Sequence, residues 1–135
     1  MTVLPLELGC LAGVAYVPGG RSPKEGLDCW GFFREARRLL GLSVPPLNLI
    51  TEKSLQDAAF RAGMASPEWI IKKEPQRGLL ALFRTPRGHH CGVMLDGVAF
   101  AHITRAGLGV ARLDDRRWRA ACIGVYDYEP TRQEN

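Results

Sequence analysis

The sequence predicts an α+β domain in which N-terminal helices pack on one face of a C-terminal antiparallel β-sheet of about five strands. Three observations predict this fold class. Apolar residues recur at helical spacing in the first half of the 135-residue chain, they form short or alternating runs from Gly78 onward, and turn-forming residues separate those runs. Helices followed by a series of antiparallel strands form two layers around one core.

Three helical segments are expected in the first half. They cover residues 4–12, Cys29–Leu40, and a stretch from Thr51 or Ser54 to about Arg61. Asp28 is a favourable N-cap for the second helix, and Gly41 is a stop signal directly after it. Between the first two helices, residues 18–23 are rich in Pro and Gly and predict a loop.

Five strands are expected in the second half. They cover Leu79–Phe83, His90–Leu95, Ala99–Thr104, Val110–Leu113 and Ile123–Tyr128. Asp96-Gly97, between the second and third of these strands, is typical of a tight hairpin. Because the chain has the length of one domain and shows no internal repeat, we interpret residues 1–130 as a single domain and 131–135 as a frayed tail.

Composition excludes several classes of protein. Hydrophobic residues make up 46% and charged residues 24% of the chain, which is ordinary for a globular domain and unlike a disordered one. No apolar run approaches the roughly 18 residues that a membrane span needs. The first 17 residues contain Glu7 and no basic residue, so they do not resemble a secretion signal. We therefore expect cytoplasmic synthesis without a signal peptide, and delivery by another component if the protein acts outside the cell.

The chain is mildly basic, with 18 Lys and Arg against 14 Asp and Glu and a net charge of +4. The positive charge is dispersed except for a cluster of Arg112, Arg116, Arg117 and Arg119. A solvated face explains this cluster most simply, and a polyanionic partner such as a cell-wall polymer is the alternative. We expect no nucleic-acid partner, because a single-strand groove requires a series of aromatic residues among the basic ones.

The four cysteines form no Cys-x-x-Cys pair, so we expect reduced thiols and no disulfide. Cys10 and Cys122 have apolar surroundings in the sequence and are expected as small core residues. Zinc ligands are present by type at His89, His90, Cys91 and His102. Their spacing differs from that of the usual zinc sites, so no metal or other cofactor is expected.

Cys29 is the candidate nucleophile. It lies in the first turn of a predicted helix, where free N–H groups and the helix dipole favour a thiolate. A thiolate nucleophile needs an imidazole partner, and His90 and His102 lie on two predicted neighbouring strands that can bring them together. This is the arrangement of papain-like hydrolases. The simpler interpretation is a small buried cysteine at a helix start, with incidental histidines elsewhere.

Several sequence blocks, in this order, are similar to those of the NlpC/P60 cysteine peptidases, and especially to their bacteriophage-tail branch. The resemblance extends from about residue 8 to residue 128. The pairing of Asp-Cys-x-Gly with a later His-x-Gly-Val is its most specific part. The blocks are Ala15-Tyr16-Val17-Pro18-Gly19-Gly20, Gly26-Leu27-Asp28-Cys29-Trp30-Gly31, Gly78–Arg84, His90-Cys91-Gly92-Val93-Met94-Leu95-Asp96-Gly97 and Phe100-Ala101-His102.

This resemblance implies a papain-like NlpC/P60 fold and a role for each matching residue. Cys29 is the implied nucleophile, His90 the general base and acid, and His102 the residue that orients the His90 ring. His89 competes with His90, but the His-x-Gly-Val frame selects His90, and strand alternation is expected to turn His89 away from Cys29.

The resemblance also implies substrate-binding positions at Tyr16, Asp28 and Trp30, with Tyr16 beside the nucleophile. Three residues depart from the family pattern. Leu79 stands where Gly-Asp is common. Trp30 stands where the cell-wall endopeptidases usually have Ser, and Cys91 stands where an aliphatic residue is usual.

The implied activity is hydrolysis of an amide in peptidoglycan stem peptides, of the D-glutamyl–diamino acid type, through a thioester on Cys29. Phage tail or tail-tip proteins are the implied partners, with the protein associated with a virion or brought to the cell wall by a tail-like particle. Two alternatives remain open. One is a structural tail-assembly protein with vestigial catalytic residues, and the other is a cysteine acyltransferase or deamidase on the same scaffold.

Overall fold

The computed structural model describes residues 4–45 and 68–130. The helix expected to end near Arg61 and the expected frayed tail at 131–135 lie outside these residues. The helices and strands, in chain order, are η1 (Leu6–Leu11), β1 (Arg21–Ser22), β2 (Gly26–Leu27), α1 (Cys29–Leu39), β3 (Trp69–Lys72), β4 (Leu80–Thr85), β5 (Gly88–Met94), β6 (Ala99–Thr104), β7 (Gly107–Arg112), α3 (Arg116–Ala121) and β8 (Cys122–Tyr128).

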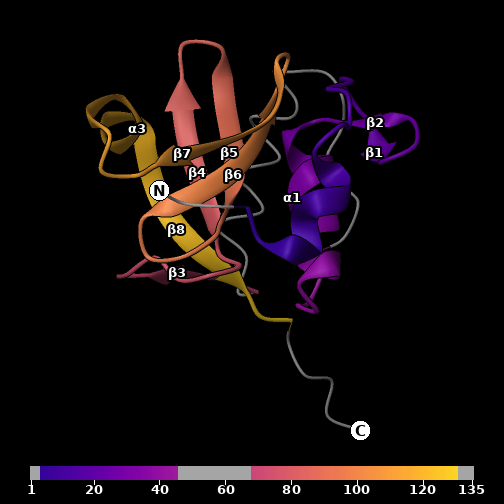
Figure 1. Cartoon of the computed structure of the whole chain (residues 1–135). Coiled ribbons are helices and arrows are strands. Elements are labelled where there is room, and N and C mark those ends of the chain that lie inside the picture. The colour runs from indigo at the N-terminus through magenta and orange to yellow at the C-terminus, as the bar shows by residue number, and fades with distance from the viewer. Residues whose placement is uncertain (1–3, 46–67, 131–135) are drawn as a thin grey trace, which may run out of the picture.

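The main sheet has six strands in the order β3-β8-β4-β5-β6-β7, and every neighbouring pair is antiparallel (Figure 1). The five expected strands are all present, and the expected hairpin joins β5 to β6. In its loop, Asp96 accepts hydrogen bonds from the backbone N–H groups of Val98 and Ala99, both at 2.8 Å. The α+β fold class is therefore confirmed, with one strand more in the main sheet than expected. A separate two-stranded sheet, β1-β2, begins within the segment expected to be a loop.

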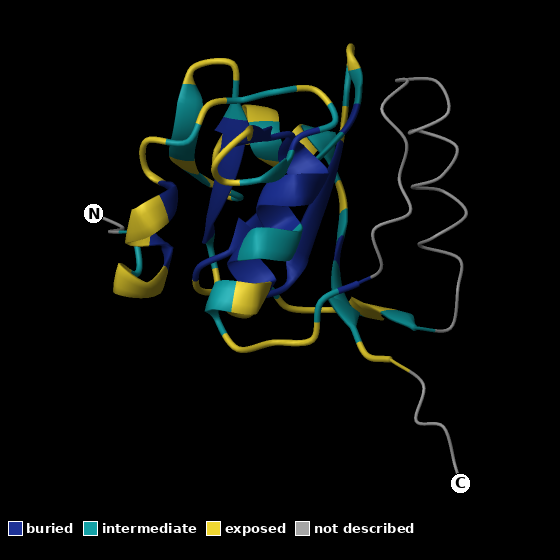
Figure 2. Ribbon diagram, turned by 90° about the vertical axis from the view of Figure 1, so that its right-hand side faces the viewer, coloured by how far each residue is buried: buried dark blue, intermediate teal, exposed yellow. Residues whose placement is uncertain are grey.

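α1 packs on one side of this sheet, as expected, and defines what we call the helix face. Figure 2 shows α1 and the sheet behind it largely buried. The hydrophobic core lies between them. Its buried sheet residues are Leu80, Leu82, Cys91, Val93, Leu95, Ala101 and Ile103, and the α1 residues against them include Phe32, Phe33 and Ala36.

The opposite side of the sheet, which we call the far face, has a smaller and more aromatic cluster. Trp118 of α3 packs against Phe83 and Phe100, with ring centroids 4.9 and 5.3 Å apart. The other buried members of this cluster are Leu79, Ala81, Met94 and Val125. α3 thus covers part of a face that the expected fold left open.

A buried arginine ties α1 to the sheet. Arg37 is 2% exposed, and its guanidinium donates to the backbone oxygens of Gly78 and Tyr128 at 2.9 and 3.1 Å. It also forms an ion pair with Asp127 at 3.1 Å. A buried guanidinium is tolerated when its donors are satisfied, as they are here. These bonds fix the position of α1, and with it the position of the first helical turn.

Two details of the N-terminal region differ from expectation. The segment Leu6–Leu11 is a 3₁₀ helix and not an α-helix, and it follows Pro5 and contains Gly9, a poor residue for a helix interior. Cys10 is exposed and not in the core, because Leu8 and Leu11 are the residues of this segment that turn inward.

Cys122, which was also expected in the core, is half-buried. Among the described residues, no helix has the length and hydrophobicity to cross a membrane.

Candidate active site

The start of α1 is held by Asp28, its N-cap. One carboxylate oxygen of Asp28 accepts from the backbone N–H of Gly31 at 2.8 Å, and the other accepts from Gly19 at 3.1 Å. Arg21 pairs with the same carboxylate at 2.7 Å. The buried Asp28 thus joins the loop before β1, the β1 strand and the helix start, and fixes the backbone on which Cys29 follows.

Gly31, the glycine of the Asp-Cys-x-Gly motif, is required because there is no space for a side chain at this position. A Cβ atom at Gly31 would lie 2.3 Å from the backbone oxygen of Gly20, a separation that no side chain tolerates. The loop therefore crosses directly over the first turn of α1. This crossing brings Tyr16 and Gly19 to the end of the helix where Cys29 lies.

The two histidines of the site form a direct hydrogen bond. His90 Nε2 lies 2.8 Å from His102 Nδ1, and the two rings meet edge to face. β5 and β6 pair only at Val93↔Ala101 and Met94↔Phe100, so ladder pairing ends before it reaches His90. The bonded rings occupy this end of the two strands.

Gly92, the glycine of the His-x-Gly-Val motif, is also required because a side chain would not fit at this position. A Cβ atom at Gly92 would lie 2.7 Å from the backbone oxygen of Ala101 and 2.9 Å from the Phe100 ring. It would also lie 3.2 Å from Cβ of His102. The missing side chain of Gly92 therefore makes room for the aromatic residues of β6, including the His102 ring that bonds His90.

The thiol of Cys29 has an environment that favours the thiolate. Cys29 is 7% exposed. A hydrogen bond with the Cys91 side chain lowers its pKa most, burial raises the pKa, and the hydrogen bond and charge of His90 lower it further. The net result is a Cys29 pKa well below the ordinary thiol value, despite the opposing charge of Asp28. A thiolate beside an imidazole is the reactive form of cysteine.

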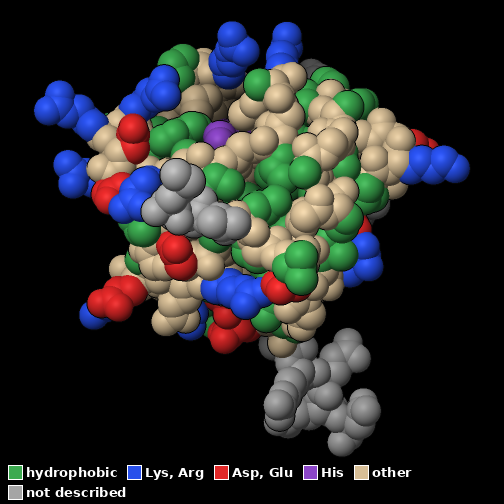
Figure 3. Space-filling model, viewed as in Figure 1, with side chains coloured by type: hydrophobic (Ala, Val, Ile, Leu, Met, Phe, Trp, Pro, Cys, Tyr) green, Lys and Arg blue, Asp and Glu red, His purple; other side chains and the backbone are tan. Residues whose placement is uncertain are grey.

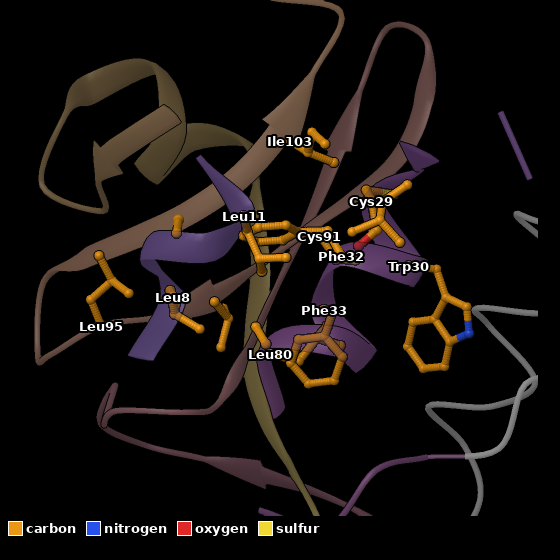
Figure 4. Packing of buried hydrophobic residues seen from close by; sticks show 14 of the residues in the cluster. Leu8, Leu11, Cys29, Trp30, Phe32, Phe33, Leu80, Cys91, Leu95 and Ile103 are labelled. Carbon is orange, nitrogen blue, oxygen red and sulfur yellow. Dashed lines mark hydrogen bonds between the residues drawn. The ribbon is translucent and has the colours of Figure 1, made fainter. Parts of the chain in front are cut away.

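Cys91 therefore belongs to the site, although the sequence suggested only an unusual residue in the core. It is fully buried on the helix face, and its Sγ lies 3.4 Å from the backbone oxygen of Cys29 (Figure 4). Its single S–H proton can be donated to this oxygen or to the thiolate. The charged thiolate is the stronger acceptor.

His102 is suited to orient a neighbouring ring without taking up a proton itself. Burial and the charge of His90 lower the pKa of His102 from 6.5 to about 4. The ring is therefore neutral at pH 7. When His90 is the imidazolium partner of the Cys29 thiolate, both of its ring nitrogens carry N–H. Its Nε2 then donates to Nδ1 of neutral His102, and its Nδ1 is left for the thiolate.

Three aromatic residues surround the histidine pair. Trp118 lies 5.1 Å from the His102 ring and 6.1 Å from the His90 ring, measured between centroids. Phe100 lies 5.1 Å from His102, and Phe83 lies 6.3 Å from His90. These rings provide the burial that lowers the pKa of His102 and restrict how far either imidazole can turn. No motif in the sequence indicated Trp118 as part of the site.

A cleft of about 790 Å³ opens beside these residues. Figure 3 shows a histidine side chain (purple) at the surface on this side of the molecule. The described residues that line the cleft are Tyr16, Pro18, Gly19, Asp28, Thr85, Pro86, Arg87, His89, His90, Ile103, Thr104, Arg105, Arg117 and Trp118. A space of this size accommodates a short peptide segment.

Of the three residues expected to bind substrate, two line the cleft and one lies in the core. Tyr16 and Asp28 line the cleft. Trp30 is not among the described lining residues: it is 3% exposed and packs on Phe33 and Trp69, with centroids 5.8 and 6.1 Å apart. Figure 4 shows its ring directed away from Cys29. Packing in the aromatic part of the core therefore explains why a large apolar residue stands at position 30. This explanation requires no contact between Trp30 and substrate.

The structure also separates His89 from His90, although both line the cleft. His89 alternates with Cys91 and so belongs to the helix-face set of β5, whereas His90 packs against Phe83 and Trp118 of the far face. His90 nonetheless interacts with Cys29, through a hydrogen bond and through its charge. The His-x-Gly-Val frame selects His90, but strand alternation, which was expected to turn His89 away, does not keep His89 out of the cleft. His90 is still the ring that interacts with the thiol.

Among the described residues, no group of three or more His, Cys, Asp or Glu side chains is arranged to hold a metal ion. His90 and His102 bond each other directly.

The α+β fold, with a cysteine at a helix start beside a histidine pair on adjacent strands, defines a papain-like class of domain. Residues 13–127 match the model of the NlpC/P60 family, and the chain belongs to that family. Among curated proteins, none matches the chain.

Two solved structures show the same fold. One is a protein from Staphylococcus aureus subsp. aureus Mu50, described as similar to a lipoprotein of the NLP/P60 family. It has a TM-score of 0.62 and 21% identity over 93% of this chain, which spans only 39% of that protein. The other is the NlpC/p60 domain of the peptidoglycan hydrolase SagA, with a TM-score of 0.54 and 22% identity over 89% of this chain and 91% of that domain.

Proposed function

We propose that this chain is a cysteine peptidase that hydrolyses an amide bond in peptidoglycan stem peptides, between D-glutamate and a diamino acid. The observation that carries the proposal is the chain of contacts from Cys29 to His90 to His102, in which the pKa of the thiol is lowered and the two rings are bonded at 2.8 Å. Membership of the NlpC/P60 family supports the choice of substrate, since SagA is by name a peptidoglycan hydrolase.

In the proposed reaction, the Cys29 thiolate attacks the carbonyl carbon of the scissile amide and forms a tetrahedral oxyanion. The protonated His90 then donates its Nδ1 proton to the leaving nitrogen, and the C–N bond breaks to give a thioester and a free amine. Water attacks the thioester with His90 as general base. The C–S bond breaks, which releases the carboxylic acid and restores the thiol–imidazole pair. Throughout, neutral His102 holds the ring of His90 in position.

The oxyanion needs hydrogen-bond donors at the helix start. The N–H groups of the first turn of a helix have no partners within the helix, so the backbone N–H of Cys29 is suited to this role. Tyr16 lines the cleft beside it, and burial together with the charges of Cys29 and Asp28 raises the pKa of its hydroxyl. A hydroxyl that stays protonated remains a donor at neutral pH.

Digestion of purified muropeptides, followed by mass spectrometry, tests this proposal. We expect products cut between D-glutamate and the diamino acid, and no products from Cys29→Ala. Activity should persist in EDTA and disappear after alkylation with iodoacetamide. Loss of activity in EDTA with recovery on adding zinc would replace the thiol mechanism with a metal-dependent one.

The same assay separates the two other activities that the sequence leaves open. An acyltransferase would give new amides when a primary amine is added, whereas a hydrolase gives mainly the free acid. A structural protein with a vestigial site would give no products, and its Cys29 would not react with iodoacetamide at neutral pH. The low pKa of Cys29 predicts rapid alkylation instead.

We further propose delivery of this domain to the cell wall by a phage tail or a tail-like particle after cytoplasmic synthesis. The support is the likeness of Asp28-Cys29-Trp30-Gly31 to the phage-tail branch of the family. Sedimentation of a native lysate tests this: the chain should migrate with a large assembly that contains tail proteins. A free protein found outside the cytoplasm with a processed N-terminus would contradict it.

A further inference from the structure

Three arginines stand around the cleft, each on a different segment of the chain. Arg87 lies in the turn between β4 and β5, Arg105 lies in the turn between β6 and β7, and Arg117 lies on α3. We call them the arginine rim. In Figure 3, Lys and Arg side chains (blue) project at the edge of the molecule on the side where a histidine (purple) reaches the surface. The rim lines the same cleft as His90 and Tyr16, and both of these residues interact with Cys29.

The charges of the arginine rim are not neutralised within the described part of the protein. All three side chains are exposed, and none forms an ion pair with a described residue. Elsewhere arginine is often paired, as in Arg37 with Asp127 and Arg112 with Asp114. The rim is thus a concentration of free positive charge at the cleft.

The cleft offers no negative charge to balance the rim. Asp28 is the only carboxylate among its described lining residues. Its oxygens already accept from Gly31 and Gly19 and pair with Arg21. An anionic group entering the cleft therefore meets three arginines and one carboxylate that is already fully engaged. Such a site attracts anions and repels cations.

We infer that the arginine rim binds a free carboxylate of the substrate beside the scissile amide, so that the enzyme selects anionic stem peptides over their amidated forms. This inference rests on the proposed function. An amide made through the side chain of D-glutamate leaves the α-carboxylate of that residue free, next to the bond to be cut. The planar guanidinium of arginine binds a carboxylate through two parallel hydrogen bonds. A carboxamide at the same place has no charge and offers only one acceptor atom.

Within the rim, Arg105 is placed to have the largest effect. Burial raises the pKa of Tyr16, the charges of Cys29 and Asp28 raise it further, and the charge of Arg105 lowers it. Arg105 and Tyr16 line the same cleft, and the pKa of Tyr16 responds both to the charge of Arg105 and to that of Cys29. A carboxylate bound by Arg105 would lie near the reacting carbonyl.

Two synthetic stem peptides test the inference. They are identical except that the α-carboxyl group of D-glutamate is free in one and is a carboxamide in the other. We expect kcat/KM of the wild-type protein to be at least about tenfold higher for the free acid than for the carboxamide. An effect of this size is typical of losing one hydrogen bond to a charged group. Arg105→Gln should lower this ratio most, and Arg87→Gln and Arg117→Gln should lower it less. Arg105→Lys, which keeps the charge and loses the planar fork, should lie between wild type and Arg105→Gln.

Arg119→Gln is the matched control, because Arg119 is an exposed arginine of the same short helix as Arg117 and does not line the cleft. It should leave the ratio unchanged. Arg119→Gln should also keep the wild-type rate on both peptides, and circular dichroism checks that each rim variant is folded.

Three results would overturn the inference. Equal cleavage of both peptides by wild type would reject carboxylate selection and leave the proposed function standing, whereas cleavage of neither would reject the proposed function as well. Rim variants that lose retention on immobilised heparin, with an unchanged ratio between the peptides, would instead assign the arginine rim to a polyanionic polymer.

Discussion

The two faces of the sheet contribute different halves of the candidate site. The helix face is aliphatic and closed: α1 covers it, and the thiols of Cys29 and Cys91 lie there with very little exposure. The far face is aromatic and only partly covered, by the short helix α3, and it carries the bonded pair of His90 and His102. The two halves meet at the end of β5 and β6, where these strands no longer pair.

This difference shows how a two-layer fold can bring a thiol and an imidazole together. On the helix face, burial and an N-cap fix the backbone of the nucleophile, so its position depends on packing. On the far face, ring contacts and one hydrogen bond fix the imidazoles, so their orientation depends on a few polar and aromatic contacts. Substitutions on the two faces should therefore affect activity in different ways.

The largest effect is expected where the two halves touch. Cys29→Ala and His90→Ala should each lower kcat on a muropeptide substrate by a factor on the order of 10⁴ to 10⁶, because nucleophile and base act as a unit. For the same reason the double variant should lose little more than either single one. Steady-state rates, with folding checked by circular dichroism, measure this. Full activity in Cys29→Ala would remove the covalent mechanism.

Within the far face, His102 should matter less than His90. His102→Ala should leave measurable activity, with a loss roughly 100-fold smaller than that of Cys29→Ala, by analogy with the orienting residue of a catalytic triad. His102→Gln or His102→Asn keeps a hydrogen-bond acceptor for the His90 ring and should retain more activity than His102→Ala. If all three variants have the same rate, the 2.8 Å bond between the rings does not contribute to catalysis.

The burial of His102 also predicts a pH dependence of stability. His102 is protonated below pH 6.5 in the unfolded chain and only below about 4 in the folded one. The unfolded state therefore binds more protons between these values, and the free energy of unfolding falls as the pH is lowered from about 6.5 to 4. The expected loss is about 3 kcal/mol, since each pKa unit corresponds to about 1.4 kcal/mol.

Urea unfolding at several pH values checks this, with His102→Gln as the control. The variant lacks the titrating group and should lose less stability than wild type over the same range. Parallel pH curves for the two proteins would show that His102 is not the source of the acid sensitivity.

Much of the fold could be predicted from sequence because its signals are local. Asp28 caps α1, Gly41 follows the helix, and Asp96-Gly97 makes the hairpin, each by chemistry confined to a few residues. Among the expected strands, β4, β5 and β6 contain runs of buried residues, whereas β7 and β8 are mostly half-buried and were indicated by apolar residues between turns. The two motif glycines, Gly31 and Gly92, were visible in sequence, but the backbone approaches that require them were not.

The elements that were missed lack such signals. β3 is an edge strand with outward-facing apolar residues, including Ile71 at 64% exposure, and therefore shows no alternating pattern. α3 has six residues, none of them buried, so it has no apolar stripe to detect. Its Trp118 reaches the histidines only because the chain returns across the far face after β7. Such long-range placements depend on the whole fold and not on any local pattern.

A smaller effect is expected from the second thiol of the helix face. Cys91→Val restores the aliphatic residue usual in the family and removes the hydrogen bond that lowers the pKa of Cys29 most. The pKa of Cys29 should rise, and alkylation by iodoacetamide at neutral pH should slow by about tenfold, the value of a hydrogen bond to a charged group. Cys91→Ser, which keeps a donor, should stay closer to wild type. An unchanged pH profile of alkylation in Cys91→Val would show that His90 alone stabilises the thiolate.

The smallest effect on catalysis is expected from a substitution of His89. The activity of this variant shows which face of the sheet supplies the general base. His89 is buried at 5% exposure and belongs to the helix-face set of β5, yet the pKa of Cys29 responds to His90 and Cys91. His89→Ala should therefore cost about 1–3 kcal/mol of stability, as is typical for a buried side chain, and leave kcat near wild type. Thermal unfolding and rates below the melting temperature separate the two effects. An inactive but folded His89→Ala protein, beside an active His90→Ala protein, would transfer the role of base to the helix face and leave the bonded pair of His90 and His102 without a catalytic function.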